Sequence, residues 1–355
     1  MLKRRHILTI RLTGRRITLL LSELWFLLIA VLFIGFFFLE GYDFGVGMAT
    51  RFVAKNDLER RVLINTIGPF WDANEVWLIT AGGAMFAAFP NWYATLFSGF
   101  YVPLVVMLLL LIARGTAFEF RAKVAHPKWG ETWDWAIFIP SLLVPFLWGV
   151  VFSSLVYGLP IDSKMNMHGV FSSFVNPYTV LGGLLITLLC LYHGLVYLCL
   201  RTTDDLRDRA RTLAKRIFWI LAAAAIAFVV VTFFVTDLFT RRGGWLYPIY
   251  LLDVAALILS VLFLGKKRDG WAFGMNAGVI LLTVASLFIG LFPRVMVSNI
   301  KPAYDLTIYN SASGSYSLGV MTIVAVTLLP FVLGYSIWSY TVFKKRVSKK
   351  EHLEY

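Results

Sequence analysis

Charged residues, cysteines and histidines are all scarce in this sequence. Only 15% of its 355 residues are charged, and it holds two cysteines and five histidines. Cys190 and Cys199 share one apolar run without a CxxC or CxxCH spacing, which excludes a disulfide framework and a covalently attached haem. His193 is the one histidine within an apolar run, so the sequence offers no intramembrane histidine pair to ligate a haem iron.

The sequence also lacks the short motifs of several enzyme classes. It has no HExxH motif, no Cys/His cluster, no Walker motif and no GxGxxG motif. We therefore expect this chain to bind no metal ion and to carry no catalytic or redox centre of its own.

Apolar residues, in contrast, are abundant. They make up 59% of the chain, with 30 Phe and 12 Trp, and the mean hydropathy is +0.75. This composition is typical of an all-α integral membrane protein. The formal net charge of +13 could suggest nucleic acid as a partner. Basic residues crowd the cytoplasmic loops of membrane proteins, however, and we expect membrane lipid and no nucleic acid.

Long uncharged runs predict nine transmembrane helices, each near the roughly 20 residues that a bilayer requires. A soluble domain and short repeats are absent, and the longest loop is expected at 293–317. The predicted spans are 22–49, 65–89, 94–118, 135–158, 178–200, 217–238, 245–265, 271–292 and 319–343.

The distribution of Lys and Arg predicts the orientation in the membrane. The loops after the first, third, fifth and seventh spans hold four, four, six and three basic residues, and the tail after the last span adds five. The loops on the other face hold none, one, two and two. Basic loops remain in the cytoplasm, so the C-terminus and its tail, 346–355, are expected there. With nine spans, the N-terminus lies outside.

The N-terminal segment does not fit this scheme. Residues 1–18 carry six basic residues and no acidic one, which the positive-inside rule disfavours on the outer face. We therefore hypothesise that this basic leader is not native and that the native protein begins near Leu19 to Ser22. The membrane domain then comprises residues 19–345.

Four acidic residues interrupt the first two apolar runs. Glu40 and Asp43 lie in the first, and Asp72 and Glu75 in the second. Each pair is spaced i, i+3, which places both side chains on one face of a helix. Acids at membrane depth are costly and usually functional, although a single acid can serve only to cap a helix or pair with an arginine.

The predicted orientation places these acids at a similar depth. Glu40 lies eleven residues before Arg51, and Asp72 lies eleven residues after Arg61. Both are therefore about 16 Å from the cytoplasmic charges. Because consecutive antiparallel helices are usually neighbours, we expect Glu40 and Asp72 to face one another, with Asp43 on the cytoplasmic side. Such a layout indicates a proton path.

Other polar or small residues near these acids have two interpretations each. Trp71 and Asn74 are candidates to support the acids. Arg114 could neutralise an acid or a cofactor propionate, although extension of its side chain to the surface is more common. Gly41 and Gly45 more often serve close helix packing than ligand binding. A structural role and a functional role remain open for Asp253 and for His193.

Several long segments resemble subunit II of cytochrome bd quinol oxidases. The resemblance covers about residues 20–345. It is carried by Phe38-Leu39-Glu40-Gly41-Tyr42-Asp43-Phe44-Gly45-Val46-Gly47-Met48, by Asn65 to Ala84 with its Gly-Pro-Phe-Trp-Asp-Ala-Asn-Glu-Val-Trp core, by Phe97-Ser98-Gly99-Phe100-Tyr101, by Arg114 to Arg121 and by Phe292-Pro293.

The resemblance implies a fold and a set of partners. The family fold is two four-helix bundles plus one peripheral helix. Members pair with a homologous subunit I, usually with a small single-helix protein as well, and the complex oxidises quinol and reduces oxygen to water. Haem b558, haem b595 and haem d are expected on subunit I and not on this chain.

The resemblance also implies roles for two of the acids. In the family, a proton path from the cytoplasm uses the acid of the Asp/Glu-Gly-Phe/Tyr-Asp motif and the Asp of the Trp-Asp motif, which match Glu40 and Asp72 here. A proton-coupled secondary transporter is the alternative, because midplane acids mark transporters too. A transporter should show inverted repeats with broken helices, and the sequence has no such symmetry.

Overall fold

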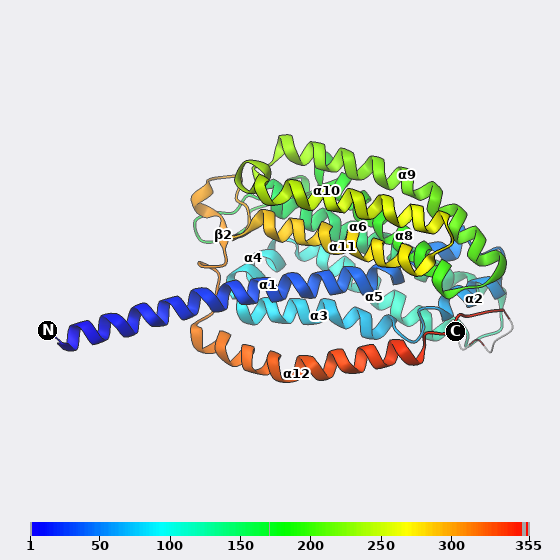
Figure 1. Cartoon of the computed structure of the whole chain (residues 1–355), viewed down its shortest axis with the longest axis horizontal. Coiled ribbons are helices and arrows are strands. Elements are labelled where there is room, and N and C mark those ends of the chain that lie inside the picture. Colours follow the sequence, from blue (N-terminus) through cyan, green and yellow to red (C-terminus); the bar gives the residue numbers. More distant parts are fainter. Residues whose placement is uncertain (1, 170, 350–352, 354–355) are drawn as a thin grey trace.

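The computed structural model describes residues 2–169, 171–349 and 353, with side chains described from residue 18 onward. Most of this part of the chain is helical (Figure 1). The helices are α1 (Leu2–Phe52), α2 (Asp57–Asn65), α3 (Trp71–Ala88), α4 (Pro90–Gly99), α5 (Tyr101–Phe120), α6 (Pro127–Tyr157), α7 (Phe171–Phe174), α8 (Pro177–Arg201), α9 (Asp204–Val235), α10 (Leu238–Gly265), α11 (Asp269–Leu291) and α12 (Ser315–Val342).

Eight of these helices are long and apolar enough to cross a membrane, namely α1 from Thr18 onward, α5, α6, α8, α9, α10, α11 and α12. They confirm a multi-pass membrane protein. The predicted span 65–89 is shorter than expected, because a turn at Gly68 and Pro69 separates α2 from α3, and α3 is not among the eight. The predicted span 94–118 is divided into α4 and α5 at Phe100.

Helix α1 forms the centre of the bundle. It packs against α3, α6, α8, α11 and α12, while α9 and α10 cover the side opposite α12 (Figure 1). Helix α12 lies at the periphery and keeps most of its apolar side chains exposed. Helix α1 begins at Leu2, within the predicted leader, and continues without a break into the membrane domain. Whether that leader is native stays a prediction.

A close backbone contact joins α1 to α8 at two glycines. A Cβ atom on Gly45 would lie 2.1 Å from the Cys190 carbonyl oxygen, and one on Gly194 would lie 2.3 Å from the Gly45 carbonyl carbon. Only glycine lets the two backbones approach this closely. The packing role predicted for Gly45 is confirmed. A Cβ on Gly41 would find ordinary contact distances, the nearest atom being 3.6 Å away.

The segment expected to be the longest loop contains a short hairpin. Strands β1 (Arg294–Met296) and β2 (Leu306–Thr307) pair antiparallel, with a 3-10 turn η1 (Pro302–Tyr304) between them. Arg294 donates hydrogen bonds to both carboxylate oxygens of Asp237, at 2.9 and 2.7 Å, and so fixes the hairpin to the start of α10. We call this end of the bundle the hairpin end.

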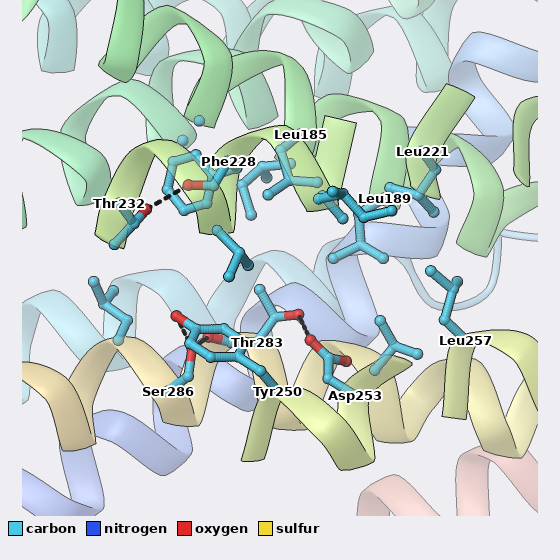
Figure 2. Close-up of a pocket in the computed structure, with 18 of the residues that line it drawn as sticks. Leu185, Leu189, Leu221, Phe228, Thr232, Tyr250, Asp253, Leu257, Thr283 and Ser286 are labelled. Carbon is cyan, nitrogen blue, oxygen red and sulfur yellow. Dashed lines mark hydrogen bonds between the residues drawn. The ribbon is translucent and has the colours of Figure 1, made fainter. Parts of the chain in front are cut away.

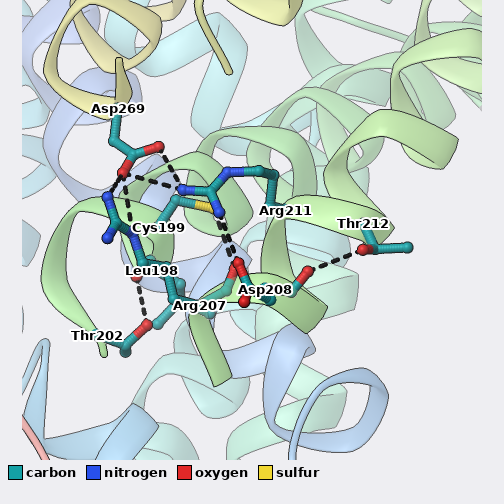
Figure 3. Close-up of polar contacts among 8 residues, drawn as sticks. All are labelled: Leu198, Cys199, Thr202, Arg207, Asp208, Arg211, Thr212 and Asp269. Carbon is teal, nitrogen blue, oxygen red and sulfur yellow. Dashed lines mark hydrogen bonds and ion pairs between the residues drawn. The ribbon is translucent and has the colours of Figure 1, made fainter. Parts of the chain in front are cut away.

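At the opposite end, where the C-terminus lies, ion pairs join α9 to α11 (Figure 3). Asp269, the first residue of α11, accepts hydrogen bonds from Arg207 Nε at 3.0 Å and from Arg211 Nη2 at 2.9 Å. Arg211 also contacts Asp208 at 2.8 Å. These ion pairs hold the start of α11 beside α9. Helix α8 packs against both of these helices in the core of the bundle.

Candidate functional site

A buried ion pair lies in the middle of the bundle, between α1 and α5. Glu40 and Asp43 on α1 and Arg114 on α5 are all fully buried. Arg114 Nη1 donates a hydrogen bond to Glu40 Oε1, and its guanidinium lies over the rings of Phe44 and Phe118, 4.7 and 5.2 Å from their centres. The more common alternative, in which the arginine side chain extends to the surface, is therefore wrong for Arg114. Arg114 neutralises an acid instead.

Three further side chains surround Asp43. Asn74 of α3 donates from Nδ2 to Asp43 Oδ2 at 2.7 Å and to the Tyr42 hydroxyl at 2.8 Å. The Tyr340 hydroxyl of α12 donates to Asn74 Oδ1 at 2.7 Å and lies 2.5 Å from the Tyr42 hydroxyl. Three helices thus converge on one carboxyl group.

The charges of this cluster do not cancel. Two carboxyl groups, Glu40 and Asp43, face a single guanidinium, and Glu75 also interacts electrostatically with Arg114. Glu40 Oε2 and Asp43 Oδ1 have no hydrogen-bond partner among the described side chains. An uncompensated charge in a low-dielectric interior is costly. Binding of one proton makes the trio of Glu40, Asp43 and Arg114 neutral, so the cluster is suited to hold an exchangeable proton.

The predicted meeting of Glu40 with Asp72 is wrong within this chain. Asp72 is exposed, whereas Glu40 is fully buried. Successive helical residues turn by about 100°, so Asp72 and Asn74 point to nearly opposite sides of α3, and Asn74 is the residue that faces α1. Glu75 is half-buried and lies within electrostatic reach of both Asp72 and Arg114. The four acids therefore form an inner pair and an outer pair.

Sequence reasoning missed two residues of this site and underrated one. Asn74 and Trp71 were expected only to support the acids, yet Asn74 contacts Asp43 directly, whereas Trp71 packs on Phe118 with ring centres 5.1 Å apart. Tyr42 lies between the two acids of its motif, and this position could have indicated that it belongs to the site. Tyr340 is distant in sequence and lies in an apolar helix, so no pattern pointed to it.

His193 does not fit a haem ligand in this structure. Its Nε2 contacts the Phe38 carbonyl oxygen at 3.0 Å, and its Nδ1 contacts Asn276 Nδ2 at 2.8 Å. The ring also stacks on Phe273, with centres 4.9 Å apart. Both ring nitrogens are engaged, which leaves neither available to an iron. Across the described residues, His, Cys, Asp and Glu form no group of three that could hold a metal ion.

A separate apolar cavity of about 430 Å³ lies among α8, α9, α10 and α11 (Figure 2). Asp253 lines it and accepts a hydrogen bond from Thr283 at 3.0 Å through Oδ2. Asp253 Oδ1 has no partner among the described side chains. The Tyr250 hydroxyl accepts a long hydrogen bond of 3.4 Å from Ser286 on the same wall. This cavity is distinct from the Glu40 cluster, and the role of Asp253 stays open.

Another buried acid, Glu59 of α2, lies at the end of the bundle where the C-terminus lies, outside the membrane spans. It accepts hydrogen bonds from Arg209 at 2.5 Å, from Lys349 at 2.8 Å and from the Lys55 backbone amide at 2.7 Å. Burial alone would raise the pKa of Glu59, but these hydrogen bonds outweigh it and lower the pKa to about 2. Glu59 therefore holds the C-terminal tail against α2 as a carboxylate.

These features define a multi-pass helical membrane protein that holds a charged cluster among its buried helices. The chain belongs to the cytochrome bd terminal oxidase subunit II family, whose model matches residues 21–343.

Known relatives agree over nearly the full length of the chain. Cytochrome bd ubiquinol oxidase subunit 2 of Bacillus subtilis is 58% identical over 335 residues, which cover 94% of this chain and 99% of that protein. Cytochrome bd-I ubiquinol oxidase subunit 2 of Escherichia coli K12 is 35% identical over 364 residues, covering 93% and 96%. The solved bd oxidase of Geobacillus thermodenitrificans has the same fold, with a TM-score of 0.73, 18% identity and coverage of 92% and 99%.

Proposed function

We propose that this chain acts in a bacterial membrane as subunit II of a bd-type quinol oxidase and provides part of its proton path. The family membership supports the assignment to a quinol:oxygen oxidoreductase of the respiratory chain. It favours an oxidase subunit over a proton-coupled secondary transporter. The chain contributes structure and proton transfer, and the redox chemistry belongs to the complex.

The observation that carries the proton path is the unbalanced charge of the buried cluster. Glu40 and Asp43 share one arginine, and each keeps one carboxylate oxygen free of described partners. Protons enter at Asp43 and pass to Glu40, while Arg114 holds the Glu40 carboxyl in place. Proton transfer over gaps longer than about 3.5 Å requires ordered water.

The outer pair of acids extends this path towards a partner. Asp72 is exposed and Glu75 half-buried on α3, so both can be reached by a second subunit. Glu75 interacts electrostatically with Arg114 and with Asp72 and thus links the inner pair to the outer pair. In this proposal Asp72 passes the proton to subunit I, in place of the direct contact with Glu40.

The family membership supports the following proposal for the partners and the cofactors. Subunit I carries haem b558, haem b595 and haem d and oxidises quinol, a small single-helix subunit completes the complex, and α12 is the peripheral helix beside two four-helix bundles. The basic residues at the end of the bundle where the C-terminus lies support an orientation with that end in the cytoplasm and the N-terminus outside.

Purification of the tagged chain in mild detergent tests the subunit assignment. Co-expressed with its partner, the chain should bring down a haem-bearing protein with bd-type absorption bands. Expressed alone, it should give no stoichiometric haem in a pyridine haemochrome spectrum, because both nitrogens of His193, the one histidine buried among the described side chains, are engaged. Haem bound to the isolated chain at one equivalent would contradict the assignment of the haems to subunit I.

A further inference from the structure

Tyr42, Asn74 and Tyr340 form a closed ring of hydrogen bonds beside the acids. Tyr340 uses its one hydroxyl proton to donate to Asn74 Oδ1 at 2.7 Å. Asn74 Nδ2 donates to the Tyr42 hydroxyl at 2.8 Å. The 2.5 Å contact between the two hydroxyls must then use the proton of Tyr42. Each residue donates once and accepts once within the ring, so its direction is fixed.

The ring determines how Asp43 is held. Asn74 has one N–H left outside the ring, and it donates to Asp43 Oδ2 at 2.7 Å. That oxygen is the acceptor for Asn74, and an unprotonated carboxyl oxygen is the stronger acceptor, so a proton on Asp43 is better placed on Oδ1. On the other acid, Glu40 Oε1 is the acceptor for Arg114 in the same way. Two carboxyl oxygens remain, Asp43 Oδ1 and Glu40 Oε2, and they are the two without described partners.

We propose that the exchangeable proton of the cluster is shared between Asp43 Oδ1 and Glu40 Oε2, and that Tyr340 is a positioning residue that fixes this arrangement through Asn74. The inference rests on the proposed proton path and adds to it the last helix, α12. The two carboxyl groups lie on the same face of α1, because their residues are three positions apart in the helix. The proton therefore moves from one oxygen to the other with no net change in the charge of the pair.

The surroundings of the hydrogen-bond ring support a positioning role for Tyr340. The phenol ring of Tyr340 stacks on Phe70 at 4.4 Å between centres, and that of Tyr42 stacks on Tyr197 at 4.2 Å. Aromatic packing therefore holds both phenol rings in place without their hydroxyls. The charged groups that face Asp43 are Glu40, Glu75 and Arg114. Removal of the hydroxyl of Tyr340 or Tyr42 leaves those charges unchanged and lets the Asn74 amide rotate. This rotation weakens the hydrogen bond from Asn74 to Asp43.

The test uses the assembled oxidase complex with Tyr340→Phe and, as a matched control, Tyr335→Phe on the exposed side of the same helix. Quinol-driven oxygen uptake, haem content and the infrared difference spectrum between the oxidised and reduced complex are measured for each. Asp43→Asn identifies the carboxyl band of Asp43. Tyr340→Phe should keep full haem, slow uptake about fivefold, as expected for the loss of one hydrogen bond, and shift the Asp43 band. Tyr335→Phe should change nothing.

Tyr42→Phe removes the second ring hydroxyl from a different helix and should reproduce both effects, so it decides the question if Tyr340→Phe does not assemble. An unshifted Asp43 band with uptake equal to the Tyr335→Phe control would overturn the inference. If Asp43→Asn itself assembles with full haem and unchanged uptake, the proposed proton path is wrong. If Asp43→Asn is slow and both ring variants behave as the control does, only the inference fails.

Discussion

At the scale of single residues, the face of the helix on which an acid lies decides whether it joins the buried cluster. The i, i+3 spacing placed Glu40 and Asp43 on one face of α1, and the structure buries both. The same argument could not tell which face of α3 turns inward, because apolar residues occur on all sides of that helix. Asp72 therefore seemed equivalent to Glu40 in the sequence, whereas its neighbour Asn74 occupies the inner face.

Arg114 shows a second limit at this scale. Its place at the end of an uncharged run suited both a surface position and an ion pair. The choice depends on which side chains other helices bring near it, and here α1 brings Glu40. A sequence read along one chain does not contain this information, since the two residues lie 74 positions apart.

The pH dependence of stability can be predicted for Glu59. Its pKa falls from an ordinary value of 4.5 to about 2 in the folded chain. A group whose pKa is lower in the folded state stabilises the fold at pH values above its pKa in the unfolded state. The stabilisation by Glu59 is therefore complete above about pH 4.5 and disappears as the pH falls towards about 2. Glu59→Gln should cost about 2 kcal/mol at pH 7, since Arg209 and Lys349 lose a charged partner.

Thermal unfolding of the purified complex between pH 7 and pH 3 checks this expectation. The difference in melting temperature between the native chain and Glu59→Gln should shrink steadily below about pH 4.5. Glu131→Gln, at an exposed position, serves as the control and should show no difference at any pH. A constant difference down to pH 3 would show that the hydrogen bonds of Glu59 do not depend on its charge.

At the scale of helices, length and the absence of charge predicted most of the architecture. Eight of the nine expected spans correspond to helices that can cross a membrane. The break between α2 and α3 falls inside an uncharged run, so charge could not reveal it, although Gly68-Pro69 was a local signal. The break at Phe100 also had a local signal, because Gly99 precedes it and Pro103 follows it.

The contact between α1 and α8 gives a prediction for helix packing. Gly45→Ala would place a methyl group 2.1 Å from the Cys190 carbonyl oxygen, so the helices must separate. The cost should be about 2 kcal/mol or more. The complex should melt at a lower temperature or assemble poorly, as measured by haem recovered in the membrane. Gly274→Ala on α11, where a Cβ has open space, should be neutral or slightly stabilising. Equal behaviour of the two variants would mean that the bundle can absorb the separation.

At the scale of the whole molecule, the chain brings its first, third, fifth and twelfth helices together around one pair of acids. The composition predicted a membrane protein, and the resemblance predicted the family, which the comparisons confirm. The convergence on Asp43 could not be predicted, because it joins Tyr42, Asn74 and Tyr340 from three helices separated by as many as 298 residues in sequence. The central claim is that this convergence serves proton transfer.

The most direct measurement of that claim is quinol-driven oxygen uptake by complexes that carry Glu40→Gln or Asp43→Asn. Each change keeps the shape of the side chain and removes its titratable group. We expect uptake to fall at least about tenfold, roughly 1.4 kcal/mol of barrier, while haem content and assembly stay normal. Asp72→Asn should slow uptake in the same way if it passes the proton to subunit I. Glu40→Asp should retain more activity than Glu40→Gln, because it keeps a carboxyl group. If Glu40→Gln and Asp43→Asn both assemble with full haem and unchanged oxygen uptake, the buried acids are not a proton path and serve only to hold the helices together.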